Sequence, residues 1–276
     1  MVAKLLVIGG GKMGEALLQG VLSSGWATPE EVVVTEVSAP RRAELTAPGG
    51  LIASYPGLAV LGGELTPAEG VVLAVKPPDV EGVCRDLAGT EVHRALSIAA
   101  GIGLRDLEEW CGPGVAVLRA MPNIAALVGA SATALAAGTT AAAADIEWAA
   151  GVLAAAGTVV RVPEHLLNAV TGVAGSAPAY IFLVAEALTE AGVLMGLSRA
   201  VAAELVAQTI LGAGRLLTET GDGPEVLRAA VTSPGGTTAA ALRQLEASGA
   251  RSAFIEAAVA AAGRSRELAS PATPPN

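Results

Sequence analysis

Up to residue 162 the chain alternates short apolar runs with helical patterns, and after Pro163 the strand pattern stops. The predicted strands lie at residues 4–8, 31–35, 71–75, 95–99, 115–120 and 158–162, with helices at 13–25, 79–87 and 146–156. Such alternation is typical of βαβ units, which build a mainly parallel sheet with helices on both faces. The first part of the chain is therefore predicted to be an α/β domain with a Rossmann-type, doubly wound sheet.

The pattern of residues 164–268 predicts helices only, at about 164–193, 199–220, 224–231, 237–247 and 251–268. Several are apolar on every side, and a helix of that kind cannot lie on the surface of a small monomer. We expect these helices to form an intertwined interface in a dimer or larger homo-oligomer. A larger core buried against the first domain is the alternative. The predicted domains are an α/β domain at 1–163, an all-helical domain at 164–269 that forms the oligomer interface, and a disordered Pro-rich tail at 270–276.

The charge balance excludes several classes of partner. Seventeen Lys and Arg against 26 Asp and Glu give a net charge of −9, and only 3% of the residues are aromatic. This is neither the basic field nor the stacking surface that nucleic acid binding needs. Uncharged runs at 120–144 and 166–185 are long enough for a membrane span, but Gly, Pro and Asn interrupt both. We interpret them as buried helix or strand, so no membrane partner is expected.

The rare residues limit the chemistry further. The chain has two cysteines without a metal or redox spacing and two histidines, which makes a His-based metal site or a catalytic triad improbable. No metal is predicted, and a reduced cytoplasmic protein is expected. The first eight residues lead into glycines rather than a cleavage site, so they predict a strand and not a signal peptide.

A glycine motif follows the first predicted strand directly. Gly9, Gly11 and Gly14 form GxGxxG and open an amphipathic helix. In this context Gly9 allows the tight turn, Gly11 lets a pyrophosphate approach the helix N-terminus, and Gly14 allows close packing of helix on strand. The motif predicts dinucleotide binding, with a purely structural turn as the alternative.

The end of the second strand bears on which dinucleotide is bound. Glu36 lies roughly 20 residues after Gly14, where an acidic residue accepts hydrogen bonds from the adenosine ribose of NAD. Arg41 and Arg42 follow closely, and arginines there suit the 2′-phosphate of NADP. The sequence leaves the choice between NADH and NADPH open.

Two more strand ends carry polar residues. Lys76, followed by Pro77, would place a cation near the cofactor, because ligands of open α/β sheets bind at the carboxyl ends of strands. Asn123 follows the strand at 115–120 and could present an amide to the nicotinamide or the substrate. A solvated lysine and an asparagine that serves only the turn are the alternatives.

A third motif, Ser233–Thr238, precedes an Ala-rich helix. Its glycines free the backbone, the N–H groups of the first helical turn are unpaired, and two threonine hydroxyls lie beside them. This combination predicts a site for a small carboxylate that needs no charged side chain. A plain helix cap with a flexible lead-in is the alternative.

With these motifs in order, the chain resembles the pyrroline-5-carboxylate reductase family from about residue 8 to residue 268. The most specific match is Val231–Thr238, supported by Val75–Pro77, Arg119–Asn123 and Thr171–Tyr180. Two departures are Ala177, where the family usually has Gly, and Ile124-Ala125 in place of Thr-Pro. The first puts the local helix packing in doubt.

The resemblance implies reduction of the cyclic imine 1-pyrroline-5-carboxylate to L-proline with NADPH or NADH. It implies a domain-swapped homodimer that in relatives often assembles into a decamer. It also implies that Thr238 is catalytic, through a hydrogen bond with the imine nitrogen. The predicted substrate-binding residues are Glu164, Ser233, Gly235, Gly236, Thr237 and Thr238. With the motifs above, the predicted cofactor-binding residues are Ile8, Gly9, Gly10, Gly11, Lys12, Met13, Gly14, Glu36, Arg41, Arg42, Ala74, Val75, Lys76, Pro77, Ile98, Ala99, Ala100 and Asn123.

Three other functions compete with this one. A β-hydroxyacid dehydrogenase shares the two-domain plan but needs a lysine on the interdomain helix, and the chain has none after Lys76. A deazaflavin-dependent NADP reductase would leave the Ser233–Thr238 motif unexplained. A binding protein without catalysis, such as a nucleotide sensor, would not need that anion-binding turn.

Overall fold

The structure is a computed structural model that describes residues 2–269, so the predicted tail at 270–276 lies outside the described residues. Within them, residues 2–176 and 260–269 form one compact unit and Ala177–Val259 a second. These units differ in extent from the predicted domains, which divide the chain at residue 163. The short helices after residue 163 pack on the sheet, as the buried Leu167 shows, and therefore belong to the first unit.

The first unit contains one eight-stranded sheet with the order β3-β2-β1-β4-β5-β6-β7-β8. All neighbouring pairs are parallel except β6 and β7, which are antiparallel. The strands are β1 (Leu5–Ile8), β2 (Val32–Thr35), β3 (Ala59–Leu61), β4 (Val71–Leu73), β5 (Arg94–Ser97), β6 (Ala116–Met121), β7 (Ser131–Ala137) and β8 (Gly157–Arg161).

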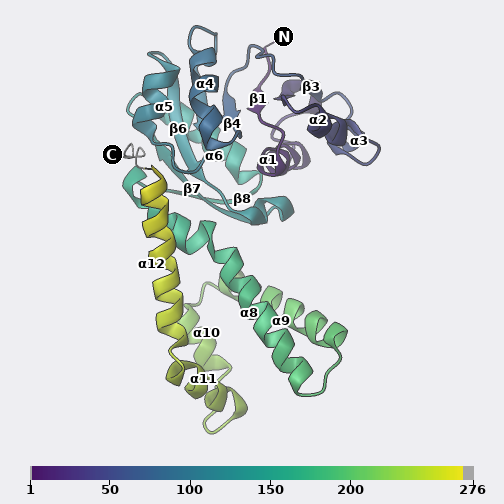
Figure 1. The fold of residues 1–276 in the computed structure, drawn as a ribbon, viewed down its shortest axis with the longest axis vertical. Helices are drawn as coiled ribbons and strands as arrows, with labels where there is room; N and C mark the ends of the chain where they lie inside the picture. The colour runs from purple at the N-terminus through teal and green to yellow at the C-terminus, as the bar shows by residue number, and fades with distance from the viewer. Residues whose placement is uncertain (1, 270–276) are drawn as a thin grey trace, which may run out of the picture. The chain divides into compact units, whose positions relative to one another are not determined.

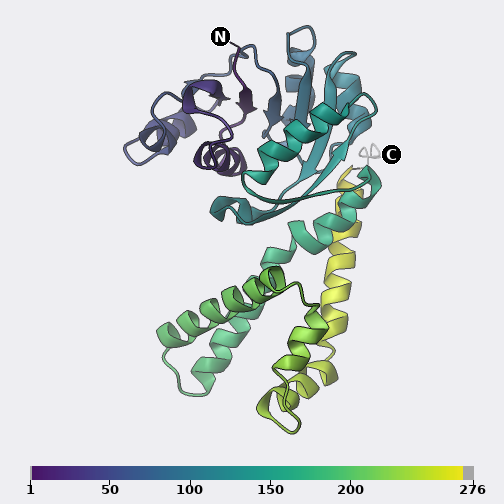
Figure 2. The same cartoon turned by 180° about the vertical axis from the view of Figure 1, so that it is seen from behind.

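Helices cover both faces of this sheet (Figure 1 and Figure 2). On one face α1 and α6 share a hydrophobic core with the sheet, and on the other α4 and α5 share a second core. The helices of the unit before residue 177 are α1 (Lys12–Ser23), α2 (Ala39–Thr46), α3 (Leu51–Ser54), α4 (Pro77–Leu87), α5 (Leu104–Cys111), α6 (Ala143–Ala154) and α7 (Leu167–Val170). Single turns are η1 (Pro29–Glu31), η2 (Ile124–Val128), η3 (Glu164–Leu166) and the π-helical η4 (Thr171–Gly175). The predicted Rossmann-type α/β fold is confirmed.

Two strands were not expected from the sequence. The β3 strand has three residues and lies at the edge of the sheet, where a short run carries little periodic signal. The β7 strand is Ser-Ala-Thr-Ala-Leu-Ala-Ala, and alanine is depleted in strands. It forms because five of its seven residues are buried and it pairs with both β6 and β8, so tertiary packing overrides the local preference.

The second unit is entirely helical within the residues described. It contains α8 (Ala177–Leu194), α9 (Arg199–Glu219), α10 (Pro224–Ala230), α11 (Thr237–Ala247) and the start of α12 (Ala250–Ala269). The α8 and α9 helices form a hairpin in which a Cβ on Gly192 would lie 2.9 Å from Cβ of Ala202. Glycine there allows the two backbones to come close.

Large apolar side chains remain exposed along this hairpin, as Phe182 at 61% and Leu194 at 89% illustrate. Two helical segments, Glu164–Leu194 and Arg199–Glu219, are long and apolar enough to cross a membrane by length and composition. Few of their residues are buried within the single chain. Such helices need a partner surface, since an exposed apolar face of this size marks an interface with protein or lipid.

Candidate active site

The carboxyl ends of the parallel strands meet at one edge of the sheet. Here β1 ends at Ile8, β2 at Thr35, β4 at Leu73 and β5 at Ser97. The chain passes from β1 to β2 on one side and returns to β4 on the other, so the order reverses beside β1. Ligands of open α/β sheets bind at such a reversal. The glycine motif, Glu36 and Lys76 all lie at this edge.

The three glycines of the motif differ in what surrounds them. Gly9 has a φ of +104°, which favours glycine, and a Cβ there would lie 2.7 Å from the carbonyl oxygen of Ala74. A Cβ on Gly14 would lie 2.1 Å from the carbonyl oxygen of Gly9. Gly11, by contrast, precedes α1 as its N-cap, with nothing within 4 Å of its Cβ position. The turn and the packing thus need Gly9 and Gly14, while Gly11 borders open space that suits an approaching pyrophosphate.

The first turn of α1 borders the same open space. No side chain caps the helix, so its N–H groups are available to a phosphate. Lys12 begins the helix with its side chain 76% exposed, and its ammonium lies 3.9 Å from the Glu15 carboxylate. A cation at this position adds charge attraction to the backbone donors.

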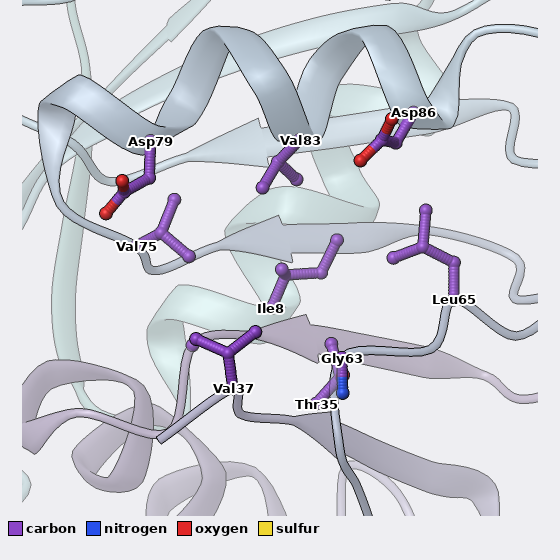
Figure 3. A pocket seen from close by; sticks show the side chains of 10 residues that line it. Ile8, Thr35, Val37, Gly63, Leu65, Val75, Asp79, Val83 and Asp86 are labelled. Carbon is purple, nitrogen blue, oxygen red and sulfur yellow. The ribbon is translucent and has the colours of Figure 1, made fainter.

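A cavity of about 270 Å³ lies beside this turn, between the ends of β1 and β2 and the length of α4. Figure 3 shows aliphatic side chains facing it from both sides, with two aspartates on the α4 side. Its volume is just below the range of about 300–1,000 Å³ for whole ligand sites, so it suits one end of a dinucleotide. The lining residues are Ile8, Gly9, Thr35, Val37, Gly63, Leu65, Val75, Asp79, Val83 and Asp86.

Most of these lining residues were missed by sequence reasoning. Ile8, Gly9 and Val75 were predicted, whereas Leu65 and Val83 belong to a loop and a helix that carry no motif. Val37 directly follows Glu36 at the end of β2, and this position could have predicted that Val37 lines the cavity.

Glu36 is held by the backbone. Its carboxylate accepts a hydrogen bond from the N–H of Gly10 at 2.9 Å and from the N–H of Ser38 at 2.8 Å. Arg41 lies next to it and donates to the Gly10 carbonyl at 2.7 Å. Burial lowers the pKa of Arg41, but hydrogen bonds with Glu44 and then Glu15 outweigh it and raise the pKa overall. The structure therefore brings the predicted residues Gly10, Glu36 and Arg41 together.

Lys76 is the N-cap of α4, and Pro77 occupies the first position of that helix. Proline suits this position because its missing N–H would have no partner in the helix. The Lys76 side chain is exposed and has no ion-pair or hydrogen-bond partner among residues 2–269. It is therefore available to a negatively charged ligand at the carboxyl end of β4.

A larger cavity of about 490 Å³ lies in the same unit and includes the predicted Pro77 and Ala100. It is lined by Pro77, Ala100, Gly101, Thr171, Ser176, Ala261, Arg264, Ser265 and Leu268. The Ser265 hydroxyl donates to Oδ1 of Asn168 at 2.8 Å, which ties the end of α12 to α7. Ile98 and Ala99 lie at the end of β5, just before this cavity, where Ala99 is buried.

Asn123 makes contacts that are internal to the protein. Its side-chain oxygen accepts from the N–H of Ala125 at 3.2 Å and caps η2. Its amide nitrogen donates to the carbonyl of Ala174 at 3.1 Å, in the π-helical turn η4. The amide thus stabilises the turn, which was the alternative raised by the sequence. It also contacts η4.

Replacement of Asn123 by alanine is expected to lower the free energy of unfolding by about 1–2 kcal/mol, because a partly buried carbonyl and N–H lose their partner. Cofactor affinity should stay near that of the wild type. Urea unfolding and cofactor titration measure the two quantities. Asn123→Asp is the comparison, since it keeps the acceptor for Ala125 but replaces the donor to Ala174 with a negatively charged oxygen, and it should destabilise at least as much. Unchanged stability with lost cofactor affinity would instead assign the amide to the nicotinamide.

Glu164 also has protein partners. Its carboxylate accepts from the N–H of Leu104 at 2.6 Å, at the start of α5, and pairs with the Arg119 guanidinium at 2.9 Å. Arg119 is buried and Glu164 is about one third exposed. The carboxylate therefore stabilises the N-terminus of α5 and neutralises a buried cation on β6.

The Ser233–Thr238 motif lies in the second unit, between α10 and α11. Gly235 has a φ of +69°, and the N–H of Gly236 donates to the carbonyl of Ser233 at 3.0 Å, which closes a tight turn. Gly236 is the N-cap of α11 and no side chain caps this helix. Within the described chain the hydroxyls of Thr237 and Thr238 have no hydrogen-bond partner. The motif thus presents backbone N–H groups and two hydroxyls that a small carboxylate can use.

The cysteines lie on neighbouring helices rather than in a metal site. Cys84 of α4 and Cys111 of α5 are buried and their thiols are neighbours. This contact, with burial, raises the pKa of Cys84. Among residues 2–269 no three His, Cys, Asp or Glu side chains gather as metal ligands would.

Two family models match separate parts of the chain. The model for pyrroline-5-carboxylate reductase dimerisation matches residues 164–268, and the one described as NADP oxidoreductase, coenzyme F420-dependent, matches residues 4–101. The first contains the exposed helices of the second unit and the Ser233–Thr238 motif. The second contains the glycine motif, Glu36 and Lys76.

Similar proteins share nearly the whole chain. Pyrroline-5-carboxylate reductase from Methanosarcina acetivorans is 41% identical over 96% of this chain and 97% of its own. The reductase from Mycobacterium tuberculosis is 43% identical, with the same coverage. Among solved structures, a pyrroline-5-carboxylate reductase from Coxiella burnetii has a TM-score of 0.87 and 35% identity, over 98% of this chain and 100% of its own. A pyrroline carboxylate reductase from Plasmodium falciparum, solved with NADP bound, has a TM-score of 0.80 and 25% identity, over 97% and 98%. By identity along its whole length, by fold and by its dimerisation domain, the chain belongs to the pyrroline-5-carboxylate reductase family.

Proposed function

We propose that this protein reduces 1-pyrroline-5-carboxylate to L-proline with NADPH or NADH, the last step of proline biosynthesis. The observation that carries this proposal is the similarity, over 96% of the chain, to reductases with that name. The dinucleotide turn and the carboxylate turn described above supply the two binding functions that the reaction needs.

The residues proposed to hold the cofactor lie along the carboxyl edge of the sheet. The α1 N-terminus with Gly11 and Lys12 suits the pyrophosphate, and the cavity beside Ile8 suits the adenosine. Pro77, which follows Lys76, and Ala100, which follows β5, line the larger cavity, where the nicotinamide would be bound. When bound, the nicotinamide supplies the hydride for the reaction.

The Ser233–Thr238 turn is proposed to hold the substrate. The N–H groups at the start of α11 would bind its carboxylate, and the Thr238 hydroxyl would form a hydrogen bond with the imine nitrogen. A protonated imine is already electrophilic, so positioning contributes more than a strong general acid. This explains a site built without histidine. Glu164 stays a proposed substrate-pocket residue, although its carboxylate has two protein partners in this structure.

The assembly is a homo-oligomer, as the dimerisation domain indicates. We infer a homodimer as its unit, with a decamer as the full assembly, and a cytoplasmic location. The exposed apolar residues of α8 and α9 would then be covered by protein and not by lipid. Neither a membrane nor a nucleic acid partner is proposed.

The test is cofactor oxidation by the purified protein, followed by the loss of absorbance of NADPH or NADH with and without the imine. Oxidation that requires 1-pyrroline-5-carboxylate and yields proline is the expected result. Binding of both cofactors without turnover would favour a binding protein or another imine as substrate.

A further inference from the structure

Two backbone N–H groups hold the carboxylate of Glu36 in place. One oxygen accepts from the N–H of Gly10 at 2.9 Å and the other from the N–H of Ser38 at 2.8 Å. A carboxylate offers about four acceptor positions, so each oxygen can still accept another hydrogen bond. In the chain Glu36 lies between Thr35 and Val37, which both line the smaller cavity. The carboxylate is therefore anchored at the rim of the proposed adenosine site.

Arg41, the first arginine that could bind a 2′-phosphate, donates hydrogen bonds to protein acceptors from all three guanidinium nitrogens. The Arg41 Nε donates to the Gly10 carbonyl at 2.7 Å, Nη1 to Glu44 at 2.6 Å and Nη2 to Glu15 at 2.5 Å. Its side chain is only 15% exposed. Every nitrogen of its guanidinium has a protein acceptor, and two carboxylates neutralise its charge. A phosphate would have to displace at least one of them.

The second arginine is oriented toward carbonyl groups. The Arg42 Nη1 donates to the carbonyls of Glu36 and Val37, at 2.7 and 2.8 Å. Glu64 interacts with Arg42 by charge: hydrogen bonds from its own N–H and that of Gly62, with the charge of Arg42, lower the pKa of Glu64. Glu64 is thus ionised at neutral pH and offsets Arg42.

The end of β2 therefore carries more negative than positive charge. Four carboxylates, those of Glu15, Glu36, Glu44 and Glu64, lie here with three cations, since the Lys12 ammonium lies 3.9 Å from Glu15 beside the two guanidinium groups. A phosphate monoester carries about two negative charges at neutral pH, so its approach to this cluster is unfavourable. Ribose hydroxyls, which donate hydrogen bonds, are instead matched to a carboxylate that is already in position.

We propose that this chain prefers NADH to NADPH and that Glu36 determines the preference by accepting hydrogen bonds from the adenosine ribose. The proposal rests on the proposed function only in that a nicotinamide dinucleotide is the cofactor. The preference is proposed for this chain alone. The relative from Plasmodium falciparum was solved with NADP bound.

Equilibrium binding tests the proposal without the imine. Fluorescence titration of the intact oligomer with NADH and NADPH should give a dissociation constant about tenfold or more lower for NADH, the effect of one charge-assisted hydrogen bond. Calorimetry should likewise give a lower dissociation constant for adenosine 5′-monophosphate than for adenosine 2′,5′-bisphosphate. The reason is that the two cofactors differ only in the adenosine half. Equal or tighter binding of NADPH would overturn the proposal.

Two variants locate the discrimination. Glu36→Gln removes the charge at nearly constant size and should narrow the ratio of the two dissociation constants about tenfold. Glu81→Gln is the matched control: it removes one charge from the exposed face of α4, where Glu81 pairs with Arg85, and should leave the ratio unchanged. If the ratio of the NADPH and NADH dissociation constants were the same in both variants and the wild type, Glu36 would not determine the preference for NADH. Failure to reduce the imine would disprove the proposed function but leave these binding ratios interpretable, so the two proposals fail separately.

Discussion

Valine at Gly14 should destabilise the first unit by about 3 kcal/mol or more, whereas valine at Gly11 should leave its stability nearly unchanged and abolish cofactor binding. The reason is steric. A Cβ at Gly14 would lie 2.1 Å from the backbone oxygen of Gly9, which cannot move without opening the turn between β1 and α1. At Gly11 the corresponding space is empty, and we propose that the pyrophosphate uses it.

The same substitution at both positions makes the comparison internally controlled. Urea unfolding followed by circular dichroism gives the stability, and fluorescence titration with NADH and NADPH gives the affinity. At the Gly11 helix cap, the change from glycine to valine should cost about 1 kcal/mol or less. If Gly11→Val destabilised as much as Gly14→Val, or kept its cofactor affinity, the assignment of Gly11 to the pyrophosphate would be wrong.

Thr238→Val should lower turnover about 100-fold, the usual effect of removing one preorganised hydrogen-bond group from a reacting centre. Valine keeps the size of threonine and removes the hydroxyl, which has no protein partner within the described residues. Thr238 lies in the first turn of α11 and not in the Gly9–Gly14 turn that is proposed to hold the cofactor, so cofactor affinity should not change. Thr238→Ser, which restores the hydroxyl, should recover most of the turnover.

Steady-state kinetics with varied imine, together with equilibrium cofactor binding, separate these effects. Thermal unfolding of each variant controls for damage to α11. An unchanged turnover number in Thr238→Val, at unchanged stability, would remove this hydroxyl from the mechanism.

The parts predicted well from the sequence are those fixed by local backbone geometry. A strand followed by glycines and an amphipathic helix allows few structures, so the turn at Gly9 and the packing at Gly14 could both be inferred. The helices of residues 177–269 were likewise predictable, because their apolar residues and the Gly and Pro residues between them define each length.

The parts that could not be predicted depend on contacts distant in sequence. The alanine-rich β7 strand forms only because two neighbouring strands bury it. The contact of Asn123 with Ala174 and that of Glu164 with Leu104 span 51 and 60 residues, so these two contacts have no local signal. The arginines after β2 suggested NADP by type, and only the structure places acidic partners around them.

Transfer of an isotopic label tests the central claim most directly, namely that this protein moves hydride from a nicotinamide onto a cyclic imine. The protein would be incubated with 1-pyrroline-5-carboxylate and NADH carrying deuterium at both C4 positions, and the proline analysed by mass spectrometry and NMR. We predict proline with one deuterium on the ring carbon that was double-bonded to nitrogen, and one cofactor oxidised for each proline formed. Proline without deuterium, or cofactor oxidation without proline, would contradict the assignment.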